Sequence, residues 1–206
     1  LSVLTGRYSS SPESAFATDI RLIRERGVVA VLRDIEAAQL SDNFWNIGLV
    51  QNLETTSTTN PVFQVYLASQ IFFKDTSLLS ANVPVSELIT LGGDIHHIFP
   101  KKFLIEHGVD KSKYNQEGNY AYLDRPVNES IGKKEPKDYF GLARQQCTTK
   151  QAIVGSIIDA AELYHNLSVN CIPADVFNMG IGDYDRFLEE RRKLMASKIR
   201  KYYESL

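Results

Sequence analysis

Two adjacent histidines, His96 and His97, lie near the middle of the chain in the stretch Asp94 to Pro100, which reads DIHHIFP. Neighbouring side chains of a β-strand point to opposite faces, so two imidazoles in such a stretch serve different partners. Imidazole binds divalent metals, and it also accepts a proton from water near neutral pH. The pair therefore predicts one metal ligand and one general base.

Two asparagines follow the histidines at spacings that suit a compact site. Asn119 comes 22 residues after His97 and opens the β-like stretch 120–123, and Asn128 comes 9 residues later, shortly after a proline. Asn119 would hydrogen-bond across the intervening loop and hold His97 in place, and Asn128 would offer its amide oxygen to a metal. The ordinary alternatives are a turn residue for Asn119 and a helix N-cap for Asn128.

Further charged residues lie close to these four in the sequence. Asp94 precedes the pair on the same side of the strand as His96, as a possible third metal ligand or a group that supports one. Four lysines would be placed to contact a phosphate, although a solvated surface is an equal alternative for the first two: Lys101, Lys102, Lys133 and Lys134. The elements needed to assemble this site are a strand, a loop, a second strand and a helix.

The string resembles the HNH nucleases, also called ββα-metal or His-Me finger nucleases. In that family a ligand Asp or His precedes the catalytic His, a hydrophobic residue and a nearby Pro follow, an Asn begins the second strand, and an Asn or His on the helix is commonly followed by Lys. The matching positions, in order, are His96, His97, Ile98, Pro100, Asn119, Asn128 and Lys133. The resemblance implies that His97 is the general base, that Asn119 fixes the loop, and that His96 and Asn128 bind the metal.

One position departs from the family pattern. Some HNH nucleases carry a second helix ligand four residues after the first, where this chain has Gly132. Two protein ligands completed by water favour Mg²⁺ or Mn²⁺ over tightly bound Zn²⁺.

A narrower resemblance covers most of the chain. The segments HHIFPKKFL and YLDRPVN are similar to the C-terminal nuclease domain of GmrSD-type proteins, and LTGRY near the start and FLEERR near the end resemble its flanks. Those proteins are modification-dependent restriction enzymes and related phage-defence proteins, in which a ParB-like nucleotide-hydrolysing domain precedes the HNH domain. The resemblance implies a DNA endonuclease whose upstream ParB-like partner is absent from this chain.

Apolar residues at helical spacing predict helices before and after the predicted site. Pro12 after Ser11 predicts a helix start, and Gly27 predicts its end. The other helices that we expect are 34–53, 62–73, one capped by Thr148 or Thr149 and carrying residues 153–164, and a last one from Asp183. The sequence thus predicts a mostly helical α+β domain with an embedded ββα-metal motif, divided into a helical flank (1–90), the nuclease motif (91–140) and C-terminal helices packed on the same domain (141–206).

Composition narrows the class of protein. The chain has 206 residues, 43% of them hydrophobic, and a net charge of −2, so no overall positive field indicates nucleic-acid binding. The last helix is locally basic, with seven basic residues against two acidic ones between Arg186 and Lys201, which is typical either of a solvated face or of a surface that follows a phosphate backbone. No apolar stretch approaches about 20 residues, and we expect a cytoplasmic protein without a membrane segment.

Two other functions remain open from the sequence. One is a non-catalytic module that binds DNA or a partner subunit through a degenerate nuclease motif. The other keeps the chemistry but acts as a toxin-like nuclease or an RNase, because a ββα unit cuts a backbone without reading bases.

Overall fold

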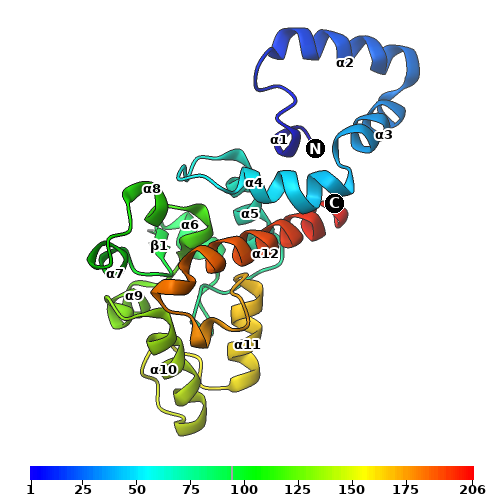
Figure 1. Ribbon diagram of the computed structural model, residues 1–206. Helices are drawn as coiled ribbons and strands as arrows, with labels where there is room; N and C mark the ends of the chain where they lie inside the picture. The colour runs from blue at the N-terminus through cyan, green and yellow to red at the C-terminus, as the bar shows by residue number, and fades with distance from the viewer. Residues whose placement is uncertain (94) are drawn as a thin grey trace.

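The structure, a computed structural model, describes residues 1–93 and 95–206, so the expected role of Asp94 lies outside the described residues. The mostly helical α+β class is confirmed: helices surround one small two-stranded sheet (Figure 1). The helices that precede the sheet are α1 (Ser2–Thr5), α2 (Pro12–Arg26), α3 (Val28–Gln39), the π-helix η1 (Phe44–Gly48), α4 (Leu49–Asn52), α5 (Pro61–Phe72) and α6 (Val85–Thr90).

The sheet consists of β1 (Ile95–His97) and β2 (Tyr120–Tyr122). Between and after the strands lie the helices α7 (Lys101–Glu106), α8 (Lys111–Tyr114), the 3-10 helix η2 (Glu117–Asn119), α9 (Arg125–Ile131), α10 (Pro136–Thr149), α11 (Ala160–Val169), η3 (Val176–Asn178), η4 (Ile181–Asp183) and α12 (Tyr184–Glu204). No helix among these described residues is long and apolar enough to cross a membrane.

The first two long helices form a hairpin that stands away from the body (Figure 1). The expected helix is confirmed as α2, with Ser11 at its N-cap, Pro12 in its first turn and Gly27 after its end at φ +82°. Among the described residues, α2 buries Asp19 alone and α3 buries Val31 alone. The apolar stripe of α2 therefore faces solvent rather than the core.

The expected continuous helix over 34–53 is wrong. The chain leaves the helix at Leu40 (φ −103°, ψ 45°) and starts again after Ser41, whose hydroxyl accepts a hydrogen bond from the Phe44 amide at 3.3 Å. Short polar side chains compete with the helix by bonding to nearby backbone, and three of them stand together here at 41–43. Trp45 and Leu49 are buried after the restart.

The expected helix over 62–73 is confirmed as α5, which has clear local signals at its start. The Asn60 side chain accepts a hydrogen bond from the Val62 amide, and Pro61 occupies the first helical position. Phe63, Tyr66 and Leu67 on α5 pack into a core with α4 and the C-terminal half of α12.

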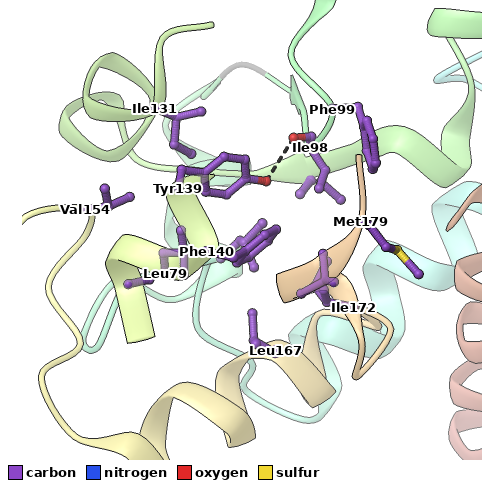
Figure 2. Packing of buried hydrophobic residues seen from close by; sticks show 14 of the residues in the cluster. Leu79, Ile98, Phe99, Ile131, Tyr139, Phe140, Val154, Leu167, Ile172 and Met179 are labelled. Atoms are coloured by element: carbon purple, nitrogen blue, oxygen red, sulfur yellow. Dashed lines mark hydrogen bonds between the residues drawn. The ribbon is translucent and has the colours of Figure 1, made fainter. Parts of the chain in front are cut away.

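The second core packs the sheet and α9 against the later helices. Figure 2 shows Phe140 near Leu79 and Leu167, and it shows the Tyr139 hydroxyl donating to the Ile98 carbonyl at 2.8 Å. That bond joins α10 to the end of β1. The ββα unit and the C-terminal helices therefore share one core.

The helix expected to begin at Thr148 or Thr149 is wrong, because α10 ends at that point. Residues 150–159 form an irregular segment held by the buried amide of Gln146, which bonds to the backbone of Ile153, Val154 and Ile157. The next helix, α11, begins only after Asp159, whose carboxylate caps it. The apolar periodicity of this stretch arises from a loop that is packed into the core.

The last helix begins after Asp183, as expected, and runs across the body (Figure 1). Its basic residues do not form one solvated face, because Arg191 is fully buried and Arg192 nearly so. The expectation of a continuous basic surface is therefore wrong for these two residues.

Candidate active site

Strand pairing places the two histidines beside the second strand. The strands are antiparallel, with His96 opposite Ala121 and His97 opposite Tyr120. Neighbours on a strand alternate in direction, so the two imidazoles leave the sheet on opposite faces. The helix α9 follows β2 directly, with Asp124 as its N-cap, and it carries Asn128 inside the helix rather than at its cap.

The ring of His97 is held by two neighbours. Its Nε2 lies 2.9 Å from Asn115 Oδ1, and the ring of Tyr120 meets it edge-on with 5.2 Å between the ring centroids. An amide oxygen only accepts hydrogen bonds, so Nε2 carries the hydrogen and Nδ1 carries the lone pair. This is the tautomer that leaves Nδ1 basic.

The surroundings of His97 favour its neutral form. Partial burial lowers the pKa of the imidazole, the hydrogen bond to Asn115 raises it in part, and the nearby charges of Lys101 and His96 lower it further. With its pKa below the ordinary value of 6.5, the ring is neutral at pH 7 and able to take up a proton.

Asn119 lies in the loop before β2 and is fully buried. Its Oδ1 accepts from the Phe99 amide at 2.8 Å, and its Nδ2 donates to the carbonyls of Phe99 at 3.1 Å and Tyr114 at 3.3 Å. Its own carbonyl accepts from the Ile98 amide at 2.8 Å. These bonds tie the chain just after β1 to the chain just before β2.

The helix α12 supports this junction from behind. Arg191 donates from Nη1 to the Gly118 carbonyl at 2.9 Å and from Nη2 to the Asn170 carbonyl at 3.4 Å. A Cβ on Gly118 would come within 3.3 Å of Leu188, so glycine allows the helix to approach this closely. Sequence reasoning placed Arg191 in a basic run and missed this role.

The expected metal ligands are one imidazole and one amide oxygen. His96 and Asn128 are both half-buried. Among the described residues, no three or more His, Cys, Asp or Glu side chains lie together so that they could hold a metal ion. Of the expected ligands, only His96 belongs to these four residue types. The amide oxygen and water suit Mg²⁺ or Mn²⁺, whereas imidazole is more typical of transition metals such as Zn²⁺, so the Mg²⁺ or Mn²⁺ ion stays a prediction.

The four lysines differ in their surroundings. Lys101 lies near His97, with its ammonium 5.5 Å from the centroid of the Tyr114 ring. Lys102 is exposed on the first turn of α7. Lys133 pairs with Glu106 at 3.3 Å, and Lys134 donates to the Ser130 carbonyl. The structure therefore places Lys101 at the histidine, whereas Lys133 and Lys134 contact protein groups.

A buried acid next to the site escaped sequence reasoning. Glu117 is fully buried, one of its oxygens accepts from Asn60 at 3.1 Å, and the other has no hydrogen bond within the described part of the chain. Burial raises the pKa of this carboxyl from 4.5 to about 8. A glutamate in a polar loop carries no sequence signal of such burial.

Comparisons with known proteins add no relative. No family model matches the chain, and no curated protein or solved structure matches it either. The resemblance to HNH nucleases therefore rests on the sequence motif and stays a prediction.

Proposed function

We propose that this chain is the metal-dependent DNA endonuclease domain of a cytoplasmic restriction or anti-phage defence protein. The observation that carries the proposal is the environment of His97 in a strand, loop, strand and helix arrangement. A half-buried imidazole with a lowered pKa, oriented through Nε2 by Asn115, has the properties of a general base.

The proposed chemistry uses the lone pair on Nδ1. His97 takes a proton from a water that attacks phosphorus in line, and the products are 5′-phosphate and 3′-hydroxyl ends. Lys101, which lies near this ring, contacts a phosphate oxygen of the bound strand. When bound by His96 and Asn128, Mg²⁺ or Mn²⁺ supplies charge stabilisation to the phosphoryl group and to the departing oxygen.

The charges of α12 bear on how DNA would be held. Arg186 pairs with three carboxylates, Lys193 pairs with Glu189 one turn before it, and Arg200 pairs with Glu204 one turn after it. Because these pairs compensate part of the positive charge and Arg191 is buried away from the surface, α12 is a weak phosphate-binding surface. We propose that an upstream ParB-like domain delivers the DNA instead.

The test is conversion of supercoiled plasmid with Mg²⁺ or Mn²⁺. The parent chain should nick the plasmid, EDTA should stop it, and His97→Ala should lower the rate by about 10²-fold or more, the effect typical of a lost general base. His107→Ala is the matched control, because His107 lies at the end of α7 and contacts the Phe103 carbonyl.

Three outcomes would count against the proposal. Equal nicking by the parent and by His97→Ala would contradict the assignment of the base. Binding of DNA without cleavage by the parent, with Mn²⁺ and with the upstream domain added, would favour the non-catalytic module. Faster cleavage of RNA than of DNA would favour the toxin-like or RNase function.

A further inference from the structure

A cavity of about 550 Å³ opens on the side of the molecule formed by the end of α5, α11 and α12. This volume lies in the range of small-molecule sites, and the residues assigned to the candidate active site do not line it.

The cavity contains a buried ion pair. Asp75 and Lys198 both line it, and Asp75 Oδ2 lies 2.6 Å from Lys198 Nζ, with the side chains only 2% and 11% exposed. Lys198 also donates to the Val169 carbonyl at 3.0 Å. Apart from the ion pair, this Asp75 oxygen accepts no hydrogen bond from the described residues. The lysine and the surrounding protein enclose this oxygen, so the ion pair is a fixed, neutral part of the cavity wall.

The rim of the cavity is cationic. Lys74, His165 and Lys201 are exposed lining residues, and Glu162 is an exposed acid among them. Since Asp75 and Lys198 neutralise each other, two lysines remain against one glutamate. The rim therefore favours an anionic group.

The walls of the cavity include apolar surface. Phe73 and Leu194 line it and are 39% and 41% exposed, and Val169, the last residue of α11, also lines it. Large apolar side chains left in contact with water beside cations suit a ligand with an apolar body.

The backbone at the cavity is held in an unusual conformation. Lys74 and Cys171 both have φ +57°, and each follows the end of a helix that borders the cavity. The Asp75 amide bonds to the Gln70 carbonyl at 2.9 Å, which is the helix-ending turn where glycine is usual. A lysine is more strained than glycine in this conformation, and residues held this way gather at binding sites.

We propose that this cavity binds a small organic anion with an apolar body. Its apolar part packs against Phe73 and Leu194, and its anionic group lies between Lys74 and Lys201. The proposal is independent of the nuclease function, because the two sites share no residue.

The test uses 8-anilinonaphthalene-1-sulfonate, a fluorescent anion with an aromatic body, titrated onto the full chain. Lys74→Gly should weaken its affinity by about threefold to tenfold, since one partly screened charge is lost. The melting temperature should stay the same or rise, because glycine relieves the strained backbone. Lys150→Gly is the matched control: Lys150 has the same φ of +57° and does not line the cavity.

A second pair of variants tests the apolar wall. Leu194→Glu should weaken dye binding at least as much as Lys74→Gly, whereas Ile105→Glu on α7, where the side chain is 50% exposed against 41% for Leu194, should not. Displacement by adenosine monophosphate but not adenosine would identify a nucleotide, and displacement by octanoate but not octanol would identify a carboxylate. Dye affinities of Lys74→Gly and Leu194→Glu equal to those of their controls would overturn the proposal.

Discussion

Asn115 is the residue that gives His97 its orientation and part of its basicity. Its side-chain oxygen is the hydrogen-bond acceptor for Nε2, and the bond raises the pKa of an imidazole that burial otherwise lowers. Asn115 touches neither metal nor phosphate in the proposed mechanism, so it acts through His97 as a positioning residue.

Asn115→Ala should therefore lower the nicking rate by about tenfold, a modest loss of orientation. It should also move the acidic limb of the pH–rate profile to lower pH, because the bond that raises the His97 pKa is gone. Asn115→Asp should move the same limb to higher pH, since a carboxylate stabilises the imidazolium. The measurement is the nicking rate against pH. Acidic limbs that coincide in the parent and in both variants would contradict a role of Asn115 in setting the His97 pKa.

The buried carboxyl of Glu117 makes the free energy of unfolding depend on pH. The folded state holds a proton on this group up to about pH 8, whereas an unfolded chain releases it near 4.5. Between these values the folded state binds more protons than the unfolded state, so the free energy of unfolding falls as pH rises from about 4.5 to 8 and levels off above that.

Glu117→Gln should abolish the fall in the free energy of unfolding between pH 4.5 and 8. The amide is neutral at every pH, and its oxygen still accepts from Asn60. We expect the variant to be more stable than the parent by about 3 kcal/mol at pH 8 and nearly equal at pH 4.5. Urea unfolding at the two pH values measures the difference, with Glu87→Gln on α6 as an exposed control. An equal difference at both pH values would show that Glu117 does not titrate in this window.

At the scale of elements, the helices that could be predicted are those with local signals. Pro12 and Gly27 bracket α2, Asn60 caps α5, and Asp183 precedes α12. Each signal acts within one turn of the residue that carries it, so the sequence is enough to place the boundary.

The helix expected over residues 153–164 was wrong because its first part binds a side chain of the preceding helix α10. The apolar run from Ile153 to Tyr164 has helical spacing, but Gln146 binds the backbone of its first part and holds it as a loop. If residues 153–157 were helical, their backbone groups would bond within the helix, and the buried Gln146 amide would lose its partners. Periodicity alone does not distinguish a helix from a loop packed into a core.

Some features of the candidate site could be predicted from the sequence, and others could not. The order of strand, loop, strand and helix, and the positions of His97 and Asn119 in it, follow from spacing in the sequence. Asn115 directly follows α8 in the segment between the two strands, without a pattern to mark it, and Arg191 reaches Gly118 from 73 residues away. Their contributions are set by packing, which a single sequence does not reveal.

At the scale of the whole molecule, α12 joins the two cores. Phe187 and Leu188 pack with the sheet and α10, whereas Met195 and Ile199 pack with α4 and α5. A helix shared by both cores couples their stabilities, so we consider the body from α4 to α12 one cooperative unit.

The hairpin of α2 and α3 lies outside that unit. Its exposed apolar side chains include Phe16, Ile20, Val29 and Leu32, and its surface ion pair of Arg26 with Asp34 contributes about 1 kcal/mol or less. With one buried residue in each helix, the hairpin should open locally at a far lower free energy than the body unfolds.

Brief digestion with dilute trypsin should therefore cut first in this hairpin, after its exposed arginines Arg21, Arg24, Arg26 and Arg33. The large product should begin between residues 22 and 34 and should melt slightly below the parent, because among the described residues Leu4 is the one buried member of the two cores that precedes the cuts. Mass spectrometry of the first products identifies the cuts, and hydrogen exchange gives an independent measure through faster exchange of α2 and α3 amides than of α12 amides. First cuts after Lys133 or Lys134, with the hairpin intact, would show that the hairpin is held more firmly than its burial implies.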